Sequence, residues 1–230
     1  MKSKTIAIIT ARGGSKRIPK KNIKDFCGKP IILYSIEAAL KSGCFDEVMV
    51  STDDNEIAEL AKEAGASVPF MRSEENANDF ATTIDVVSEV LDTYKKLGRQ
   101  FEYFCCIYPT APFVTAERLK DAMAIVQEDG VEAVMPIVRY SFPPQRSFCL
   151  NERYIEYNWP ENMLKRSQDL NPMYHDAGQF YCGSVKSFIE QKKLVMDKTV
   201  PLILSDLEVQ DIDNIEDWVI AEIKYQLLNK

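Results

Sequence analysis

A run of basic residues between positions 12 and 24 is the part of this sequence best suited to chemistry. It contains no acidic residue, and its cations are Arg12, Lys16, Arg17, Lys20, Lys21 and Lys24. Gly13 and Gly14 let the backbone approach a bound group closely, and Ser15 offers a hydroxyl. Because the formal net charge of the chain is −7, this positive charge is local. The pattern indicates a site for a small polyanion such as a triphosphate and argues against a general nucleic-acid binder.

The glycine spacing of this loop narrows the class of nucleotide site. The string ARGGSKRIPKKN at residues 11–22 is neither GxGxxG nor GxxxxGK[ST], so dinucleotide binding and Walker-type hydrolysis lose support. On composition alone, a merely solvated basic loop or a nuclear-localisation-like cluster stays open as an alternative.

Two acidic residues near the C-terminus, Asp211 and Asp213, flank Ile212. In an extended segment, side chains alternate, so both carboxylates would share one face while Ile212 points into the core. Two hard oxygen ligands suit Mg²⁺, which completes its shell with water and phosphate oxygens. The same pattern could instead mark a helix start, with Asp213 as the N-cap before Asn214. The residues alone leave both interpretations open.

An alternation of apolar runs and helical patterns must position these residues. It predicts strands at residues 5–10, 47–51, 67–71, 103–108 and 132–138, and helices at 31–41, 55–64, 82–97 and 115–128. Asp53 and Glu56 predict a capping box at the second helix. The expected fold is therefore α/β, a three-layer, doubly wound, mostly parallel sheet. In such sheets, ligands gather beyond the carboxyl ends of the strands, where the basic loop follows the first strand.

The alternation breaks between residues 141 and 174, where Pro, Asn and aromatic residues mix without a regular period. We interpret this stretch as a projecting arm that needs a partner surface, although a loop folded back over its own sheet remains an alternative. Tyr154, Tyr157 and Trp159 are then dimer contacts, so a homodimer is expected. Regular structure resumes with GQFYCGS, a strand at 200–205 and an amphipathic helix at 215–228. The whole chain, 1–230, is expected to form one domain.

Composition limits the location and the metals. No run approaches the roughly 18 apolar residues of a membrane span, and the N-terminus has no secretory pattern, so a cytoplasmic protein without membrane association is expected. The six cysteines form no CxxC pair, and the only histidine is His175, so no zinc site is predicted.

The basic loop resembles the signature RxGSKxxxxKN of the acylneuraminate cytidylyltransferases. The matching positions are Arg12, Gly14, Ser15, Lys16, Lys21 and Asn22, followed by GKP at 28–30. The similarity continues through STDDNEIAELA at 51–61, Arg72, Thr82 and Thr83, and extends over essentially the whole chain. It implies the nucleotide-diphospho-sugar transferase fold and a reaction that joins the CMP part of CTP to a nine-carbon acidic sugar, releasing pyrophosphate with the help of Mg²⁺.

The resemblance also implies roles for individual residues. It makes Arg12, Lys21 and Asp211 catalytic and Asp211 and Asp213 the magnesium ligands. The nucleotide-binding residues it implies are Ala11, Arg12, Gly14, Ser15, Lys16, Asn22, Arg72 and Thr83.

The sugar side departs from the commonest pattern of the family. Where sialic-acid enzymes tend to read QPTSPLR, this chain reads YPTAPF, so Tyr108 replaces a glutamine and Phe113 an arginine. The stretches at 166–170 and 174–181 resemble the R-x-Q and N-G-A-I-Y motifs, with Asp176, Gln179 and Phe180 altered. The combination looks most like the pseudaminic acid cytidylyltransferases, and N-acetylneuraminic or legionaminic acid is the alternative substrate. The residues implied to bind the sugar are Tyr108, Arg166, Gln168, Tyr174 and Gln179.

Several alternatives remain at this stage. Arg166 could pair with the sugar carboxylate or form only a surface salt bridge, and His175 could be a base or a structural residue. A GT-A-type glycosyltransferase shares a metal-binding Asp-x-Asp, but its acidic pair normally follows a mid-chain strand. A non-catalytic nucleotide-binding module would bind CTP without turnover.

Overall fold

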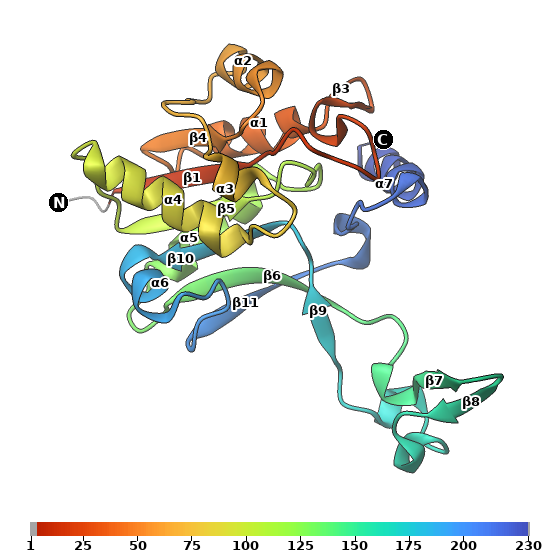
Figure 1. The fold of residues 1–230 in the computed structure, drawn as a ribbon. Helices are drawn as coiled ribbons and strands as arrows, with labels where there is room; N and C mark the ends of the chain where they lie inside the picture. Colours follow the sequence, from red (N-terminus) through yellow and green to blue (C-terminus); the bar gives the residue numbers. More distant parts are fainter. Residues whose placement is uncertain (1–3, 230) are drawn as a thin grey trace.

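A seven-stranded mixed sheet forms the middle layer of the molecule, with helices on both of its faces (Figure 1). The computed structural model describes residues 4–229. The strand order is β11-β6-β10-β5-β1-β4, and β9 also pairs with β6. The strands are β1 (Thr5–Thr10), β4 (Glu47–Ser51), β5 (Tyr103–Ile107), β6 (Ala133–Arg139), β9 (Tyr174–Asp176), β10 (Phe180–Ser184) and β11 (Thr199–Leu204). Only β9 and β10 run against the other strands, so the expected mostly parallel α/β sheet is confirmed.

The helices bury opposite faces of the sheet because side chains alternate along each strand. In β1, Ala7 and Ile9 pack with residues of α1, α2 and α5, whereas Ile6 and Ile8 pack with residues of α4 and α6. These helices are α1 (Ile32–Ser42), α2 (Asn55–Glu63), α4 (Thr83–Lys96), α5 (Ala116–Val126) and α6 (Val185–Gln191). The remaining elements include β2 (Asp25–Phe26), β3 (Lys29–Pro30), α3 (Glu74–Ala77) and α7 (Ile215–Leu228). Within residues 4–229, no helix has the length and apolar character needed to cross a membrane.

The start of α2 differs from the sequence prediction by one residue. Asp54, not Asp53, is the N-cap, and its carboxylate accepts hydrogen bonds from the amides of Glu56 (2.8 Å) and Ile57 (3.2 Å). Asp53 instead accepts a hydrogen bond from the amide of Gly13 at 2.9 Å. The predicted cap at Asp53 is wrong because that carboxylate holds the basic loop.

The predicted strand at residues 67–71 is also wrong. Only Ser67 pairs with the sheet, through an isolated bridge to Met49. Pro69, two residues later, has no N–H to donate to a ladder, and the chain leaves the sheet. It turns towards the loops beyond β4, where the amide of Arg72 donates to the carbonyl of Thr52 at 2.8 Å.

Residues 141–174 form an arm that projects away from the sheet (Figure 1). Its tip is an antiparallel hairpin of β7 (Phe148–Asn151) and β8 (Tyr154–Tyr157), and the chain returns through β9. Apolar side chains on the arm are open to solvent, with Phe142 85%, Leu150 74% and Leu164 90% exposed. The alternative of a loop folded back over its own sheet is therefore excluded.

The C-terminal segment is pinned to the N-terminal half by a small apolar cluster. Ile212 is buried there together with Ile18 of the basic loop and Trp218 of α7. Asn214 caps α7 and shares a capping box with Asp217, so the alternative of Asp213 as the N-cap is excluded. As predicted, Ile212 points into the core, and this burial brings its two acidic neighbours to the basic loop.

Candidate active site

A cavity of about 480 Å³ lies beyond the carboxyl ends of β1 and β5. Six of the residues expected to bind nucleotide line it, namely Arg12, Ser15, Lys16, Asn22, Arg72 and Thr83, together with Lys21, Tyr108 and Asp213. Ala11 and Gly14 are not among its lining residues. Ala11 is buried in the core, where its amide donates to the carbonyl of Ser51 at 2.9 Å. The fold thus gathers most of the predicted site around one hollow.

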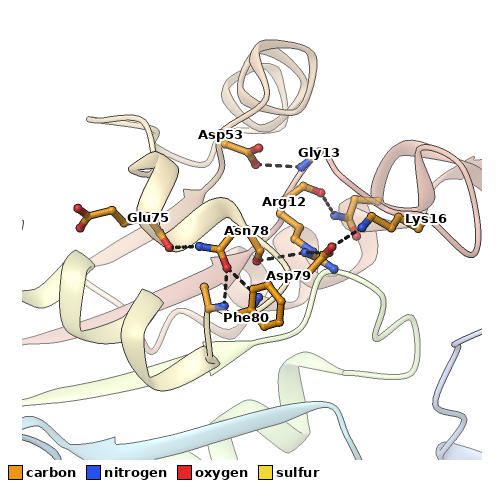
Figure 2. A network of polar contacts seen from close by, with 10 residues as sticks. Arg12, Gly13, Lys16, Asp53, Glu75, Asn78, Asp79 and Phe80 are labelled. Carbon is orange, nitrogen blue, oxygen red and sulfur yellow. Dashed lines mark hydrogen bonds and ion pairs between the residues drawn. The ribbon is translucent and has the colours of Figure 1, made fainter.

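Acidic residues from other segments pair with four of the six cations of the basic loop, Arg12, Lys16, Arg17 and Lys20. Arg12 and Lys16 both form ion pairs with Asp79, and the distance from Arg12 Nη1 to Asp79 Oδ1 is 2.7 Å (Figure 2). Arg17 pairs with Asp213 at 2.9 Å. The loop that has no acid in its own sequence therefore acquires acids through the fold.

Lys21 and Asn22 lie in a short 3-10 turn that folds the basic loop back on itself. The buried Asn22 amide donates to the carbonyl of Arg12 at 2.8 Å. Lys21 Nζ donates to the carbonyl of Ile212 at 2.7 Å and so joins the loop to the C-terminal acidic pair. Burial lowers the pKa of Lys21, while Asp213 and Asp211 oppose that shift. An ammonium held this way can face a phosphate without rearrangement.

The two glycines of the loop have different surroundings. Gly13 lies against α2, where an added Cβ would come within 2.6 Å of Asp54 Oδ2 and 2.9 Å of Asp54 Cβ. A Cβ added at Gly14 would meet no heavy atom within 4 Å. Gly13 is therefore required by packing, whereas the space beside Gly14 is open for a ligand.

Asp211 and Asp213 flank the buried Ile212, and Asp213 faces the cavity. Burial raises the pKa of Asp211, and the nearby carboxylate of Asp213 adds to the shift. Among residues 4–229, no group of three or more His, Cys, Asp and Glu side chains could hold a metal ion by itself. A cation at this pair would need further ligands from water or from a bound substrate.

The cavity lining also combines a buried guanidinium with hydroxyl groups. Arg72 is only 8% exposed, and it donates to the hydroxyl (3.0 Å) and carbonyl (2.5 Å) of Ser51. Burial lowers the pKa of Arg72, an effect that nearby acids oppose. The hydroxyls of Thr83 and Tyr108 lie 3.3 Å apart. These groups offer fixed polar contacts of the kind that the edge of a planar base requires.

Most residues expected to bind the sugar do not line this cavity within one chain. Tyr108 does, and its ring contacts that of Tyr181 with centroids 5.6 Å apart. The buried Gln179 donates its side-chain amide to the carbonyl of Glu208 at 2.5 Å, a contact that joins the residue before β10 to the turn at 206–208. Tyr174 is exposed at the root of the arm.

Arg166 and Gln168 lie on the exposed surface of the arm. Arg166 pairs with Asp169 at 2.8 Å, as in the surface salt bridge considered as its alternative role.

The structure also places Phe113 and His175, two residues that the sequence had singled out. Phe113 does not line the cavity, because its side chain is buried in the cluster that contains Ile212 and Trp218. His175 Nδ1 lies 2.8 Å from the carbonyl of Asp176, and its ring packs on Tyr140 with centroids 4.6 Å apart. The contacts of His175 are those of a structural residue.

Sequence reasoning missed Asp79 and the Tyr181–Asp176 contact. Asp79 lies between Arg72 and Thr82, two positions that the family resemblance had marked, but nothing in the local pattern names Asp79 as a partner of the loop. Tyr181 donates its hydroxyl to the carboxylate of Asp176, directly behind Tyr108. The altered stretch at 174–181 pointed to this region without indicating the pairing.

Comparison with known proteins identifies related sequences over most of the chain. The sequence profile of a family described as Cytidylyltransferase matches residues 6–209. A pseudaminic acid cytidylyltransferase of Campylobacter jejuni is 41% identical over 225 residues, which are 97% of this chain and of that one. A CMP-N,N'-diacetyllegionaminic acid synthase of Legionella pneumophila is 37% identical over 226 residues, 94% of each chain.

The fold is also similar to that of solved structures. A CMP:2-keto-3-deoxy-manno-octonic acid synthetase complexed with CTP superposes with a TM-score of 0.69, over 99% of both chains at 17% sequence identity. At this identity the likeness supports the fold alone.

The two glycines should respond differently to substitution. Gly13→Ala should lower the free energy of unfolding by about 1 kcal/mol or more, because its Cβ displaces the capping carboxylate of Asp54. Gly14→Ala serves as the matched control and should leave stability unchanged, since its Cβ meets open space. Urea denaturation of both variants measures the difference. Equal midpoints would contradict the packing of Gly13 against α2.

Proposed function

This chain belongs to the cytidylyltransferase family, and from that premise we propose that it joins the CMP part of CTP to pseudaminic acid. The products are the CMP-sugar and pyrophosphate. The reaction consumes CTP, so we place it in the cytoplasm, where the nucleotide is available. The acceptor is assigned from the named relatives and from the altered sugar-side residues.

The convergence of nucleotide-type contacts on one cavity carries this proposal. Cations that suit a triphosphate, Arg12, Lys16 and Lys21, line the cavity together with Arg72 and Thr83. Asp213 completes the lining between the loop and the C-terminal segment. A site with this layout can hold CTP at both its phosphates and its base.

In the proposed reaction, the anomeric hydroxyl oxygen of the sugar loses its proton to water and bonds to the α-phosphorus of CTP. The bond from that phosphorus to the bridging oxygen breaks, and pyrophosphate leaves with the electron pair. Arg12 and Lys21 stabilise the charge that develops on the leaving group, and the fixed loop supplies the alignment. Positioning and charge neutralisation account for most of the rate enhancement.

Asp211 and Asp213 fit a magnesium ion bound jointly with substrate phosphates. They are hard oxygen ligands, their mutual repulsion favours a cation between them, and Mg²⁺ commonly uses one or two carboxylates with phosphate and water ligands. When bound, Mg²⁺ would neutralise phosphate charge. Lys21, held on the carbonyl of Ile212, lies beside the same pair.

The choice of pseudaminic acid depends on full-length similarity together with a modified sugar side. Tyr108 presents a ring and one hydroxyl where a glutamine is typical of sialic-acid enzymes, and Tyr181 supports that ring from behind. Beside such a wall, a fully hydroxylated glycerol tail has too few hydrogen-bond partners. A 9-deoxy sugar has one hydroxyl fewer to satisfy and therefore fits better. Legionaminic acid is the second candidate, supported by the 37% identical synthase of Legionella pneumophila.

The arm at 141–174 is proposed to dock on a second copy of the chain and form a homodimer. Its exposed apolar residues have no cover from their own sheet, as Leu150 and Leu164 illustrate. Arg166 and Gln168 do not line the cavity of their own chain, so they would serve the sugar side of the partner subunit's site. A bidentate arginine is suited to the sugar carboxylate.

A panel of sugars tests the proposed function. With CTP and Mg²⁺, pyrophosphate release should show a kcat/KM for pseudaminic acid about 10-fold or more above that for N-acetylneuraminic acid, because one unpaired hydroxyl at an apolar wall suffices for that ratio. KDO, an eight-carbon sugar acid, is the negative control. No turnover with any sugar would favour a non-catalytic nucleotide-binding module. Equal values for the two nine-carbon sugars would overturn the sugar assignment alone.

The metal assignment predicts severe loss of activity without loss of fold. Asp211→Ala and Asp213→Ala should each lower kcat by at least ~10²-fold, because each removes a preorganised charge from the phosphoryl-transfer site. Asp129→Ala, at an exposed turn, is the matched control and should retain activity. Pyrophosphate release across a Mg²⁺ titration checks this. Near-normal turnover in either variant at low Mg²⁺ would contradict the assignment.

The proposed dimer predicts that charges on the arm dissociate it. Light scattering at micromolar concentration should report a dimer for the natural chain and a monomer for Leu150→Glu combined with Leu164→Glu. Leu97→Glu, at an exposed apolar residue after α4, is the control and should remain dimeric. A monomeric natural chain would refute the arm's proposed role.

A further inference from the structure

Asp79 occupies the place beside Arg12 and Lys16 that a phosphate group would take. One carboxylate oxygen contacts Arg12 Nη1 at 2.7 Å, and the other contacts Lys16 Nζ (Figure 2). All three residues line the same cavity. A bidentate anion, fixed by the chain itself, thus covers two of the cations implied to bind the triphosphate.

Several hydrogen bonds hold the turn that carries Asp79. Asn78 Oδ1 accepts hydrogen bonds from the amides of Phe80 (2.7 Å) and Ala81 (3.0 Å), and Asn78 Nδ2 donates to the carbonyl of Glu75 at 2.6 Å (Figure 2). Arg12 Nη1 also donates to the carbonyl of Asn78 at 3.2 Å. The preceding segment is tied to α4, because Glu89 accepts from the amide of Ser73 and from Asn76. These contacts direct the carboxylate into the basic loop.

A carboxylate and a polyphosphate cannot both use the same N–H donors of Arg12 and Lys16. Hydrogen bonds to Lys16 and to Arg12 lower the pKa of Asp79, so this carboxylate is charged at neutral pH and repels an incoming anion. Asp79 is exposed to solvent and reaches the cations only through its side chain, so a rotation of that side chain suffices to free them.

We propose that Asp79 is a displaceable counter-ion, which holds Arg12 and Lys16 in the free enzyme, yields them to the polyphosphate of CTP, and takes them back as pyrophosphate leaves. This inference rests on the proposed function for the identity of the nucleotide. Asp79 thereby weakens the binding of polyphosphates and limits product inhibition by pyrophosphate. The single phosphate of a mononucleotide does not need both cations, so Asp79 weakens the binding of a mononucleotide less.

The pair of Lys20 and Glu56 supplies a matched comparison within the same loop. Lys20 Nζ lies 2.5 Å from Glu56 Oε2, and both side chains are largely exposed. Neither residue lines the cavity. Neutralising Glu56 therefore changes the charge beside the loop as much as neutralising Asp79 does, without freeing a cavity cation.

Calorimetry with pyrophosphate, CTP and CMP tests the inference on the full-length protein. Asp79→Asn should lower the Kd of pyrophosphate and CTP roughly 3- to 10-fold, as expected for the loss of two competing exposed ion pairs, and change the Kd of CMP less than about twofold. Glu56→Gln should leave all three values within about twofold. Asp79→Ser repeats the measurement with a side chain too short to reach both cations.

Unchanged or weaker pyrophosphate binding in both Asp79 variants, with unaltered thermal unfolding, would overturn the inference and make Asp79 a support for Arg12. The proposed function fails differently. A natural chain that binds pyrophosphate, gains affinity on Asp79→Asn and shows no preference for CTP over other nucleoside triphosphates would contradict the nucleotide assignment while supporting the counter-ion.

Discussion

The site depends on opposite charges that the fold brings together from distant parts of the chain. Without acidic partners, the cations of the basic loop would repel one another and oppose its compact shape. Asp79 comes from the turn before α4 and Asp213 from the segment before α7, and both pair with this loop. The result is a cavity whose positive groups are in place before a ligand arrives, which reduces the reorganisation that binding requires.

An apolar contact makes this charge arrangement persist. Ile18 of the basic loop and Ile212 of the C-terminal segment are buried in one cluster with Trp218. Their burial fixes the backbone on either side, so Lys21 reaches the carbonyl of Ile212 at 2.7 Å. Hydrophobic packing is not weakened by salt as exposed ion pairs are, so it sets the geometry that the charges then use. The buried contact between Ile18 and Ile212 thus links the packing of the core to the position of the residues proposed to bind nucleotide.

The sequence predicts the elements well because periodic burial determines them, and β1 agrees with its predicted bounds at both ends. Prediction from the sequence fails for side-chain contacts between residues that are far apart in the chain. The sequence favours Asp53 as a cap because Glu56 follows three residues later, but Asp53 binds the amide of Gly13 and Asp54 caps the helix. Phe113 was assigned to the sugar side by motif position, yet packing directs it into the core. Asp79 pairs across more than sixty residues, and no local pattern encodes that contact.

The central claim is that the neutralised basic loop is the triphosphate site. A crystal structure of the full-length protein with CTP tests this claim most directly. The account predicts phosphate oxygens within hydrogen-bonding distance of Arg12 and Lys16, with Asp79 moved away from both, and the base directed towards Arg72 and Thr83. A triphosphate bound outside this cavity, with Asp79 still paired to both cations, would contradict it.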